Sequence, residues 1–285
     1  MLTKSWCQIV YSCLELFEIE EDSFMDKYRM AISGDGQEYR RILTLHSSSL
    51  AALLCFYSVS PNNPLIITIN ESPIVFTESF FEVKNKVKLN TNHDSNIDIV
   101  LRGKNSKNKN VTLFLESKFS EYLDRNNYTK ISKEVYNDFY KGLAECSEFI
   151  EKFTIDFSLE NSIAIKTNDN YCHYASGIKQ MISHYMGVNN FVKGTSAKSH
   201  KGDLSFHKDE IVYLGEIVFR FDNDCKIRGT NKTKFEDYDE CYSLLAKTLN
   251  NQFSNNFMVI DKLMTFQNVF KDFNLNPKIK EFYNL

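Results

Sequence analysis

Three residues of complementary chemistry stand at a spacing that can bring them together: Asp98, Glu116 and Lys118. Successive residues of a β-strand point to opposite faces, so Glu116 and Lys118 project from the same side of a strand. If the two segments pair as an antiparallel hairpin centred on Lys107, Asp98 lies opposite Glu116, because each is nine residues from the centre. Residues opposed in this way have Cβ atoms about 4.5–5.5 Å apart. The spacing therefore predicts two carboxylates and one ammonium in one place.

Such a pair of carboxylates repels itself unless the two groups share a cation. Mg²⁺ binds one or two carboxylates, retains several waters and binds phosphate groups; Mn²⁺ accepts the same oxygen ligands. The metal acidifies its water, and a lysine beside that water orients it and stabilises the transition state. The pattern thus predicts metal-dependent hydrolysis of phosphodiester bonds. Asp98 and Glu116 are the expected metal ligands, and Lys118 is expected to assist the nucleophilic water.

Two predicted strands would position these residues. Asn96–Leu101 and Val111–Phe119 show the alternation and the β-branched and aromatic residues typical of strands. Arg102–Asn110 between them is polar and contains turn-forming Gly and Asn, which predicts a loop. The tripeptide acid-x-Lys is weak alone: it also begins at Glu82 and Asp224. Only the copy at Glu116 follows a strand with an acid at the matching register.

The simplest alternative for Glu116 and Lys118 is an exposed ion pair on one face of a strand, which contributes little to stability. Both flanks of the pair are apolar, with Leu113–Leu115 before it and Phe119 after it. Such flanks favour a strand inside a sheet, where buried charges need a reason.

Periodicity along the rest of the chain alternates between helical and extended, which predicts an α/β fold with a central mixed sheet flanked by helices. We expect one domain over residues 1–285: a helical N-terminal extension (1–60), a catalytic core (65–221) and C-terminal helices (237–285). Helices are expected over residues 4–30, 47–57, 131–152, 177–186, 237–249 and 259–270, further strands over 65–69, 162–166 and 211–219, and a turn at 33–36.

Charge and cysteine content restrict the class of protein. The net charge is −3, so nucleic-acid binding requires a local basic surface. Residues 84–118 hold eight Lys/Arg and three Asp/Glu, a local excess of +5, although a solvated loop would look similar. The seven cysteines include no C-x-x-C pair, which indicates reduced thiols and a cytoplasmic protein. The sequence also predicts no membrane span.

The stretches Thr91–Val100 and Leu115–Tyr122 resemble the active-site region of the PD-(D/E)XK nuclease superfamily, and more narrowly a bacterial branch described as restriction-endonuclease-like. His46–Leu53, Gly177–Gly187 and Leu263–Phe270 are similar to the same branch. The resemblance implies a restriction-endonuclease-like core that cleaves DNA, or occasionally RNA, with magnesium. It assigns Asp98 and Glu116 to the metal and Lys118 to the water. One departure is that no proline precedes Asp98.

Several residues could support this site. Gln180 is similar to a helical glutamine that many of these nucleases place beside the metal, although a surface position is the alternative. Glu78 or Glu82 could supply a further acid. His184 is expected to be a packed or capping residue rather than a ligand. Glu216 is expected either behind the site or in an ion pair.

Two rival functions remain open at this stage. The first is a nucleic-acid-binding protein on the same fold without catalysis. The second is a metabolic enzyme or interaction protein, which predicts a deep apolar pocket elsewhere in the molecule. DNA is favoured over RNA as the partner, and a homodimer stays open as an assembly.

Overall fold

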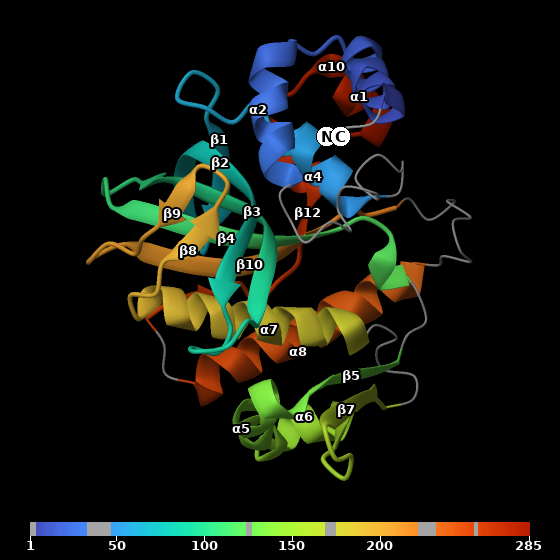
Figure 1. Cartoon of the computed structure of the whole chain (residues 1–285), viewed down its shortest axis with the longest axis vertical. Coiled ribbons are helices and arrows are strands. Elements are labelled where there is room, and N and C mark those ends of the chain that lie inside the picture. The colour runs from blue at the N-terminus through green and yellow to red at the C-terminus, as the bar shows by residue number, and fades with distance from the viewer. Residues whose placement is uncertain (1–3, 33–46, 124–126, 169–174, 222–231, 254–255) are drawn as a thin grey trace.

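A mixed β-sheet of nine strands lies at the centre of the computed structural model, which describes residues 4–32, 47–123, 127–168, 175–221, 232–253 and 256–285 (Figure 1). Its order is β11–β10–β4–β3–β2–β8–β9, with β1 paired to β2 and β12 paired to β10. The strands are β1 (Leu65–Ile69), β2 (Ser72–Lys86), β3 (Asp94–Asn105), β4 (Asn110–Lys118), β8 (Ala197–Ser199), β9 (Gly202–Leu204), β10 (Ile211–Val218), β11 (Met258–Val259) and β12 (Met264–Thr265).

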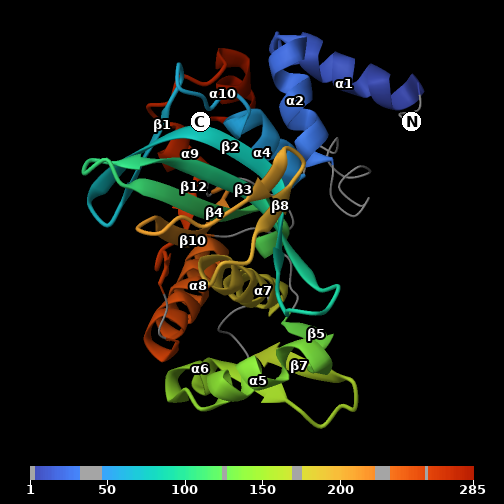
Figure 2. The ribbon, with the colours of Figure 1, turned by 60° about the vertical axis from the view of Figure 1, so that its left-hand side comes forward.

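Helices cover both faces of this sheet (Figures 1 and 2). The strand β4 is apolar on both sides: Leu113 and Leu115 face one core, and Phe114 faces the other. This double burial explains its nearly continuous apolar sequence. One face carries α1 (Lys4–Phe17), α2 (Glu21–Ala31), α4 (Ser48–Phe56), α9 (Phe266–Phe270) and α10 (Pro277–Tyr283), and the other carries α7 (Ala175–Val192) and α8 (Lys232–Gln252).

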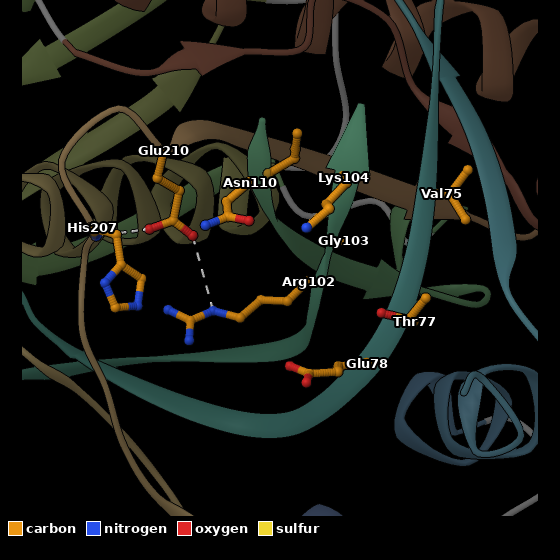
Figure 3. A pocket seen from close by; sticks show the side chains of 10 residues that line it. Val75, Thr77, Glu78, Arg102, Gly103, Lys104, Asn110, His207 and Glu210 are labelled. Carbon is orange, nitrogen blue, oxygen red and sulfur yellow. Dashed lines mark hydrogen bonds and ion pairs between the residues drawn. The ribbon is translucent and has the colours of Figure 1, made fainter. Parts of the chain in front are cut away.

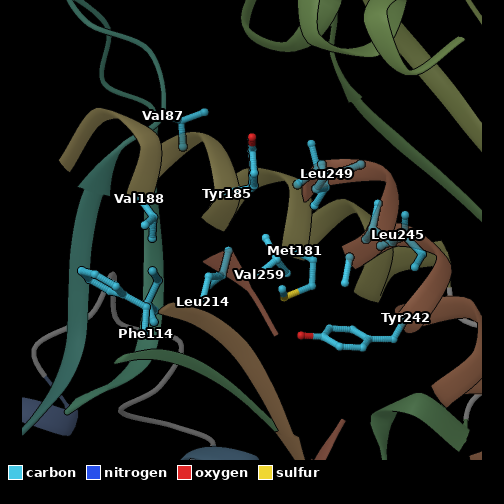
Figure 4. Packing of buried hydrophobic residues seen from close by; sticks show 14 of the residues in the cluster. Val87, Phe114, Met181, Tyr185, Val188, Leu214, Tyr242, Leu245, Leu249 and Val259 are labelled. Carbon is cyan, nitrogen blue, oxygen red and sulfur yellow. The ribbon is translucent and has the colours of Figure 1, made fainter. Parts of the chain in front are cut away.

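The α7–α8 face matters most for the site, because its core fixes α7 against the sheet. Phe114 and Leu214 extend from β4 and β10 toward Met181 and Val188 of α7, and Leu245 of α8 closes the layer (Figure 4). All five side chains are buried. Burying a side chain of this size stabilises the fold by about 1.5–3 kcal/mol, so α7 is firmly seated.

Between β4 and α7 the chain forms a smaller unit with a three-stranded sheet of its own, here called the small lobe (residues 127–168). The sheet of the small lobe packs against the two helices of the lobe, α5 and α6. Residues such as Phe149 and Ile163 join the α7–α8 core. The Tyr136 hydroxyl lies 2.8 Å from Ser183 Oγ, which ties the lobe to α7. The lobe has the strand order β5–β7–β6 and follows the short 3₁₀ helix Glu121–Leu123; it contains β5 (Tyr128–Ser132), α5 (Lys133–Ala144), α6 (Ser147–Lys152), β6 (Phe153–Asp156) and β7 (Ser162–Thr167).

The predicted α/β class with a central mixed sheet flanked by helices is confirmed. The predicted cap is also found: Ser47 Oγ accepts a hydrogen bond from Leu50 N at 3.2 Å. Within its described ranges, the structure has no helix that is both long enough and apolar enough to cross a membrane. The assignment of residues 1–285 to one domain stays a prediction, and the turn predicted at 33–36 lies outside the described residues.

Three sequence predictions need correction. The helix expected over 4–30 is two helices, separated where Glu18 adopts a φ of 51°. The loop expected at Arg102–Asn110 is only a tight turn, because Asn105 accepts hydrogen bonds from the backbone N–H of Lys107 and Lys109 and lets both strands continue. The helix expected over 259–270 is mostly wrong: β11 and β12 pair with β10, and only Phe266–Phe270 is helical.

Gly187 provides a test of how closely α7 approaches the sheet. An added Cβ would lie 2.8 Å from Asn85 Cβ and 3.3 Å from Ser95 Cβ. Gly187→Ala should therefore push α7 away and lower the free energy of unfolding by roughly 1–3 kcal/mol, measured by urea denaturation. The matched control is Gly142→Ala in α5, whose Cβ would lie 3.4 Å from the Phe253 ring. It should be neutral or stabilising, and equal stability of both variants would contradict the close approach.

Candidate active site

The hairpin of β3 and β4 has the register that the sequence predicted. Ile99 pairs with Leu115 and Val100 with Phe114, so the ladder is centred on Lys107. Asp98 precedes Ile99 and Glu116 follows Leu115, so this register, continued by one residue, places the two across from each other. The predicted antiparallel pairing is confirmed.

Acidic residues continue at this level on the two neighbouring strands. The β2–β3 ladder pairs the residues on either side of Glu82 with those on either side of Asp98. Glu82 itself has a φ of 49°, which is uncommon for a residue with a side chain and interrupts the regular strand here. On the other side, Glu116 pairs with Glu216 of the parallel strand β10. Glu82, Asp98, Glu116 and Glu216 therefore form a row across four strands, here called the acidic row.

Lys118 is the basic group within this row. Its ammonium forms an ion pair with Glu116 and donates a hydrogen bond to Gln180 Oε1 at 2.9 Å. Lys118 is 4% exposed and Glu116 is 3% exposed, so the pair is nearly withdrawn from solvent. Gln180 lies on α7, as predicted, and reaches the site from the helical layer.

His184 stands one turn after Gln180 and contacts the other oxygen of the glutamate. Its Nε2 lies 2.8 Å from Glu116 Oε2, and its Nδ1 contacts Ser95 Oγ. If the serine donates to Nδ1, the ring proton of a neutral imidazole sits on Nε2 and points to the carboxylate. The histidine is buried as expected, but it also holds Glu116. The sequence analysis missed this role, which the i, i+4 spacing of Gln180 and His184 could have indicated.

The pKa values of the two predicted metal ligands are shifted in opposite directions. Asp98 is partly exposed, and its Oδ2 accepts a hydrogen bond from Ser117 N at 2.7 Å. Burial of the carboxyl, followed by the charges of Glu116 and Glu82, raises its pKa well above the ordinary value, and Lys118 only partly opposes this. For Glu116, burial raises the pKa, but the neighbouring Lys118 and His184 outweigh it and lower the pKa overall. Without a cation, Asp98 is therefore the member of the pair that binds a proton more readily.

Glu216 closes the row behind the site. It is 0% exposed, and the Tyr238 hydroxyl donates a hydrogen bond to its Oε1 at 2.6 Å. Burial raises the pKa of Glu216 to about 8, against the opposing charge of Lys118. From the sequence, Glu216 was expected either behind the site or in an ion pair. Its position beside Glu116 agrees with a place behind the site. Glu78 lies away from the row, in a pocket at the other end of the strands.

The donor set fits a divalent cation held by two carboxylates. Within the described ranges, no three His, Cys, Asp or Glu side chains are arranged as a metal site. Mg²⁺ does not need three, because it commonly takes one or two carboxylates and fills the remaining positions with water. Asp98 and Glu116 are neighbours on adjacent strands, and the pKa of Asp98 is raised first by burial and then by the charges of Glu116 and Glu82. A bound cation would oppose both effects.

The basic residues of segment 84–118 separate into two groups. Lys104, Lys107 and Lys109 are exposed at the β3–β4 turn. The seven residue steps from Asp98 to Asn105 at the end of β3 correspond to roughly 23 Å, and Lys107 lies beyond them in the turn. Lys86, near the other end of the sheet, forms an ion pair with Asp94 at 2.7 Å. The sequence suggested one basic surface. In the structure, Lys104, Lys107 and Lys109 instead lie at the β3–β4 turn, far from the acidic row.

A pocket of about 370 Å³ lies at the turn end of the same strands (Figure 3). Glu210 accepts hydrogen bonds from Thr112 Oγ1 and His207 N, and Arg102 lies 4.0 Å from it. Most of the residues that line the pocket are polar or charged. This pocket therefore differs from the deep apolar pocket that the alternative of a metabolic enzyme predicts.

Comparisons with known proteins add no identification. No family model matches the sequence, and neither a curated protein nor a solved structure matches it.

The buried carboxyl of Glu216 predicts a pH-dependent stability. Its pKa is raised from 4.5 to about 8, so its contribution is complete below pH 4.5 and is lost as the pH rises through 8. Glu216→Gln keeps a neutral group of similar shape and should become more stable than the wild type as the pH rises, by at most about 5 kcal/mol, since one pKa unit corresponds to about 1.36 kcal/mol. Urea denaturation with EDTA at pH 5 and pH 9 measures this difference.

The control is Glu281→Gln, which changes an exposed residue of α10. Its effect on the free energy of unfolding should be small and the same at both pH values. A Glu216→Gln variant that tracks the wild type at both pH values would show that Glu216 is ionised throughout and that its burial is not as described.

Proposed function

We propose that this protein is a metal-dependent nuclease that hydrolyses phosphodiester bonds, with DNA as the preferred substrate. The observation that carries the proposal is the convergence of Asp98, Glu116, Lys118 and Gln180 at one point of the sheet, within a row that has more carboxyls than cations. Such an arrangement is costly for the fold unless a cation and a phosphate complete it.

Asp98 and Glu116 would hold Mg²⁺ or Mn²⁺. When bound, the metal supplies a more acidic water and neutralises charge on the phosphate. Lys118 orients the attacking water and stabilises the negative charge that develops as the phosphorus–oxygen bond breaks. Gln180 accepts a hydrogen bond from Lys118 and thereby fixes the direction of the ammonium. His184 fixes the carboxylate of Glu116 from the other side.

The architecture supports this proposal in a general way. The resemblance to the PD-(D/E)XK superfamily implies a central mixed sheet flanked by helices, and a sheet of this kind carries the site. The restriction-endonuclease-like assignment of the core, and its bacterial and cytoplasmic setting, are part of the same proposal.

One observation favours a second candidate function, a nucleic-acid-binding protein without catalysis. Glu116 and Lys118 are nearly buried and neutralise each other. A site that had lost its metal would retain such an ion pair as a structural contact. The two candidates differ in whether any substrate is cut.

A cleavage assay distinguishes them. Supercoiled plasmid, linear duplex, single-stranded DNA and RNA are incubated with the protein and Mg²⁺ or Mn²⁺, with EDTA as the blank. A nuclease produces metal-dependent fragments from at least one substrate. Binding without fragments under every metal condition would favour the non-catalytic candidate.

Lys118→Ala tests the assignment of the lysine. The rate of cleavage should fall by roughly 10²–10³, the usual loss when one transition-state stabiliser is removed. Nucleic-acid affinity should be unchanged, because phosphate contacts are spread over many residues. Lys109→Ala, at the exposed turn, is the control and should cut at the wild-type rate.

Because Lys118 neutralises a buried glutamate, circular dichroism must first show that the Lys118→Ala variant is folded. Asp98→Asn, which changes a partly exposed residue without changing its size, serves as a second variant with the same expected loss. If folded Lys118→Ala protein cuts as fast as the wild type, the proposed active site is wrong.

A further inference from the structure

The helix α7 presents two adjacent faces to two different neighbours. Gln180 and His184 point to the acidic row, as their contacts with Lys118 and Glu116 show. Ser183 instead contacts Tyr136 of the small lobe. Lys179 is one turn before Ser183 and lines a groove against the lobe. Residues four apart lie on one helical face, so Lys179 and Ser183 share the face of α7 next to the face that carries Gln180 and His184.

This groove has a volume of about 410 Å³ and lies between α7, the small lobe and the β2–β3 turn. Its polar lining consists of ammonium, imidazole, hydroxyl and amide groups, and no carboxylate occurs among the described residues that line it. The nearby Asp94 is already paired with Lys86. The lining groups that matter most are His93, Lys130, Ser132, Asn161 and Lys179. These are groups that donate hydrogen bonds to phosphate oxygens.

The outer face of the small lobe continues from the groove along β5. Tyr128 is 45% exposed on this strand, and Lys130 Nζ lies 5.8 Å from the centre of its ring. Lys166 on β7 pairs with Tyr128, so a second lysine stands beside the tyrosine on the neighbouring strand. The inner residues of the same strand, such as Ile131, are buried. An exposed aromatic ring beside ammonium groups is the pattern that stacks a base and binds its phosphate.

We propose that the groove and this outer face bind a stretch of nucleic acid with unpaired bases and lead it to the acidic row. Lys179 and Lys130 bind phosphates, and Tyr128 stacks on a base. The bases of a duplex are stacked inside it, so a ring on a sheet face can take a base only from an unpaired strand. The inference rests on the proposed function and adds to it the class of substrate.

Fluorescence anisotropy with a labelled single-stranded oligonucleotide, in EDTA and over a range of salt concentrations, tests the groove. The double variant Lys130→Ala/Lys179→Ala should bind more weakly. Its salt slope should decrease by about 1.4, because each phosphate of a single strand that a lysine neutralises adds about 0.7 to the slope. The matched control Lys107→Ala/Lys109→Ala removes the same charge at the distant turn. It should bind as the wild type does.

The aromatic contact has its own pair of variants. Tyr128→Ala should weaken binding of the single strand by at least about five-fold, the smaller effect expected when one base is no longer stacked. Tyr128→Phe keeps the ring and should restore the affinity. Affinity for the duplex of the same sequence should be equal in all three proteins. Circular dichroism shows that each variant is folded.

The inference is overturned if the wild type binds no single strand, if the groove variant matches the hairpin control, or if Tyr128→Ala weakens single-strand and duplex binding alike. Cleavage is measured separately. A protein that binds through the groove and cuts nothing refutes the nuclease but keeps the groove assignment. A protein that cuts while its groove variants bind normally refutes the groove assignment alone.

Discussion

The rest of the structure depends on one constraint: the four carboxyl groups of the acidic row lie in an apolar sheet beside the ammonium of Lys118. An unpaired charge in such a place would cost several kcal/mol. Side chains and backbone groups contact Glu116, Glu216 and Asp98. Lys118 and His184 each contact one carboxylate oxygen of Glu116. The Tyr238 hydroxyl donates a hydrogen bond to Glu216, and the backbone N–H of Ser117 donates one to Asp98. The contacts of His184 with Glu116 and of Tyr238 with Glu216 thus add to the apolar packing of α7 and α8 on the sheet.

This arrangement leaves one imbalance, which is the physical basis of the proposed chemistry. Lys118 and His184 lower the pKa of Glu116, whereas burial, followed by the charges of Glu116 and Glu82, raises the pKa of Asp98. A divalent cation would remove that repulsion and use both carboxylates. The same helix that supplies Gln180 and His184 also forms one wall of the groove, so the position of α7 couples the site to the small lobe.

Sequence reasoning predicted that Asp98, Glu116 and Lys118 come together because the information was local. A hairpin with strict alternation determines which residues face each other, so the partners of Asp98 followed from counting residues. The pairing of Glu216 with Glu116 could not be predicted in this way. The strand β10 is parallel to β4, and the two glutamates lie far apart in the sequence. The short strands β11 and β12 were missed because pairing with β10 overrides their apolar, helix-like pattern.

The most direct test of the acidic row is whether it binds Mg²⁺ with release of protons. Calorimetric titration in buffers of different ionisation enthalpy measures both quantities. A proton should leave Asp98 when the cation binds, because its pKa is raised in the metal-free protein. The heat should then depend on the buffer at pH values below that pKa, and Asp98→Asn should abolish this dependence. If Mg²⁺ does not bind, or binds with the same heat in every buffer across the titration range, the row is not a cation site.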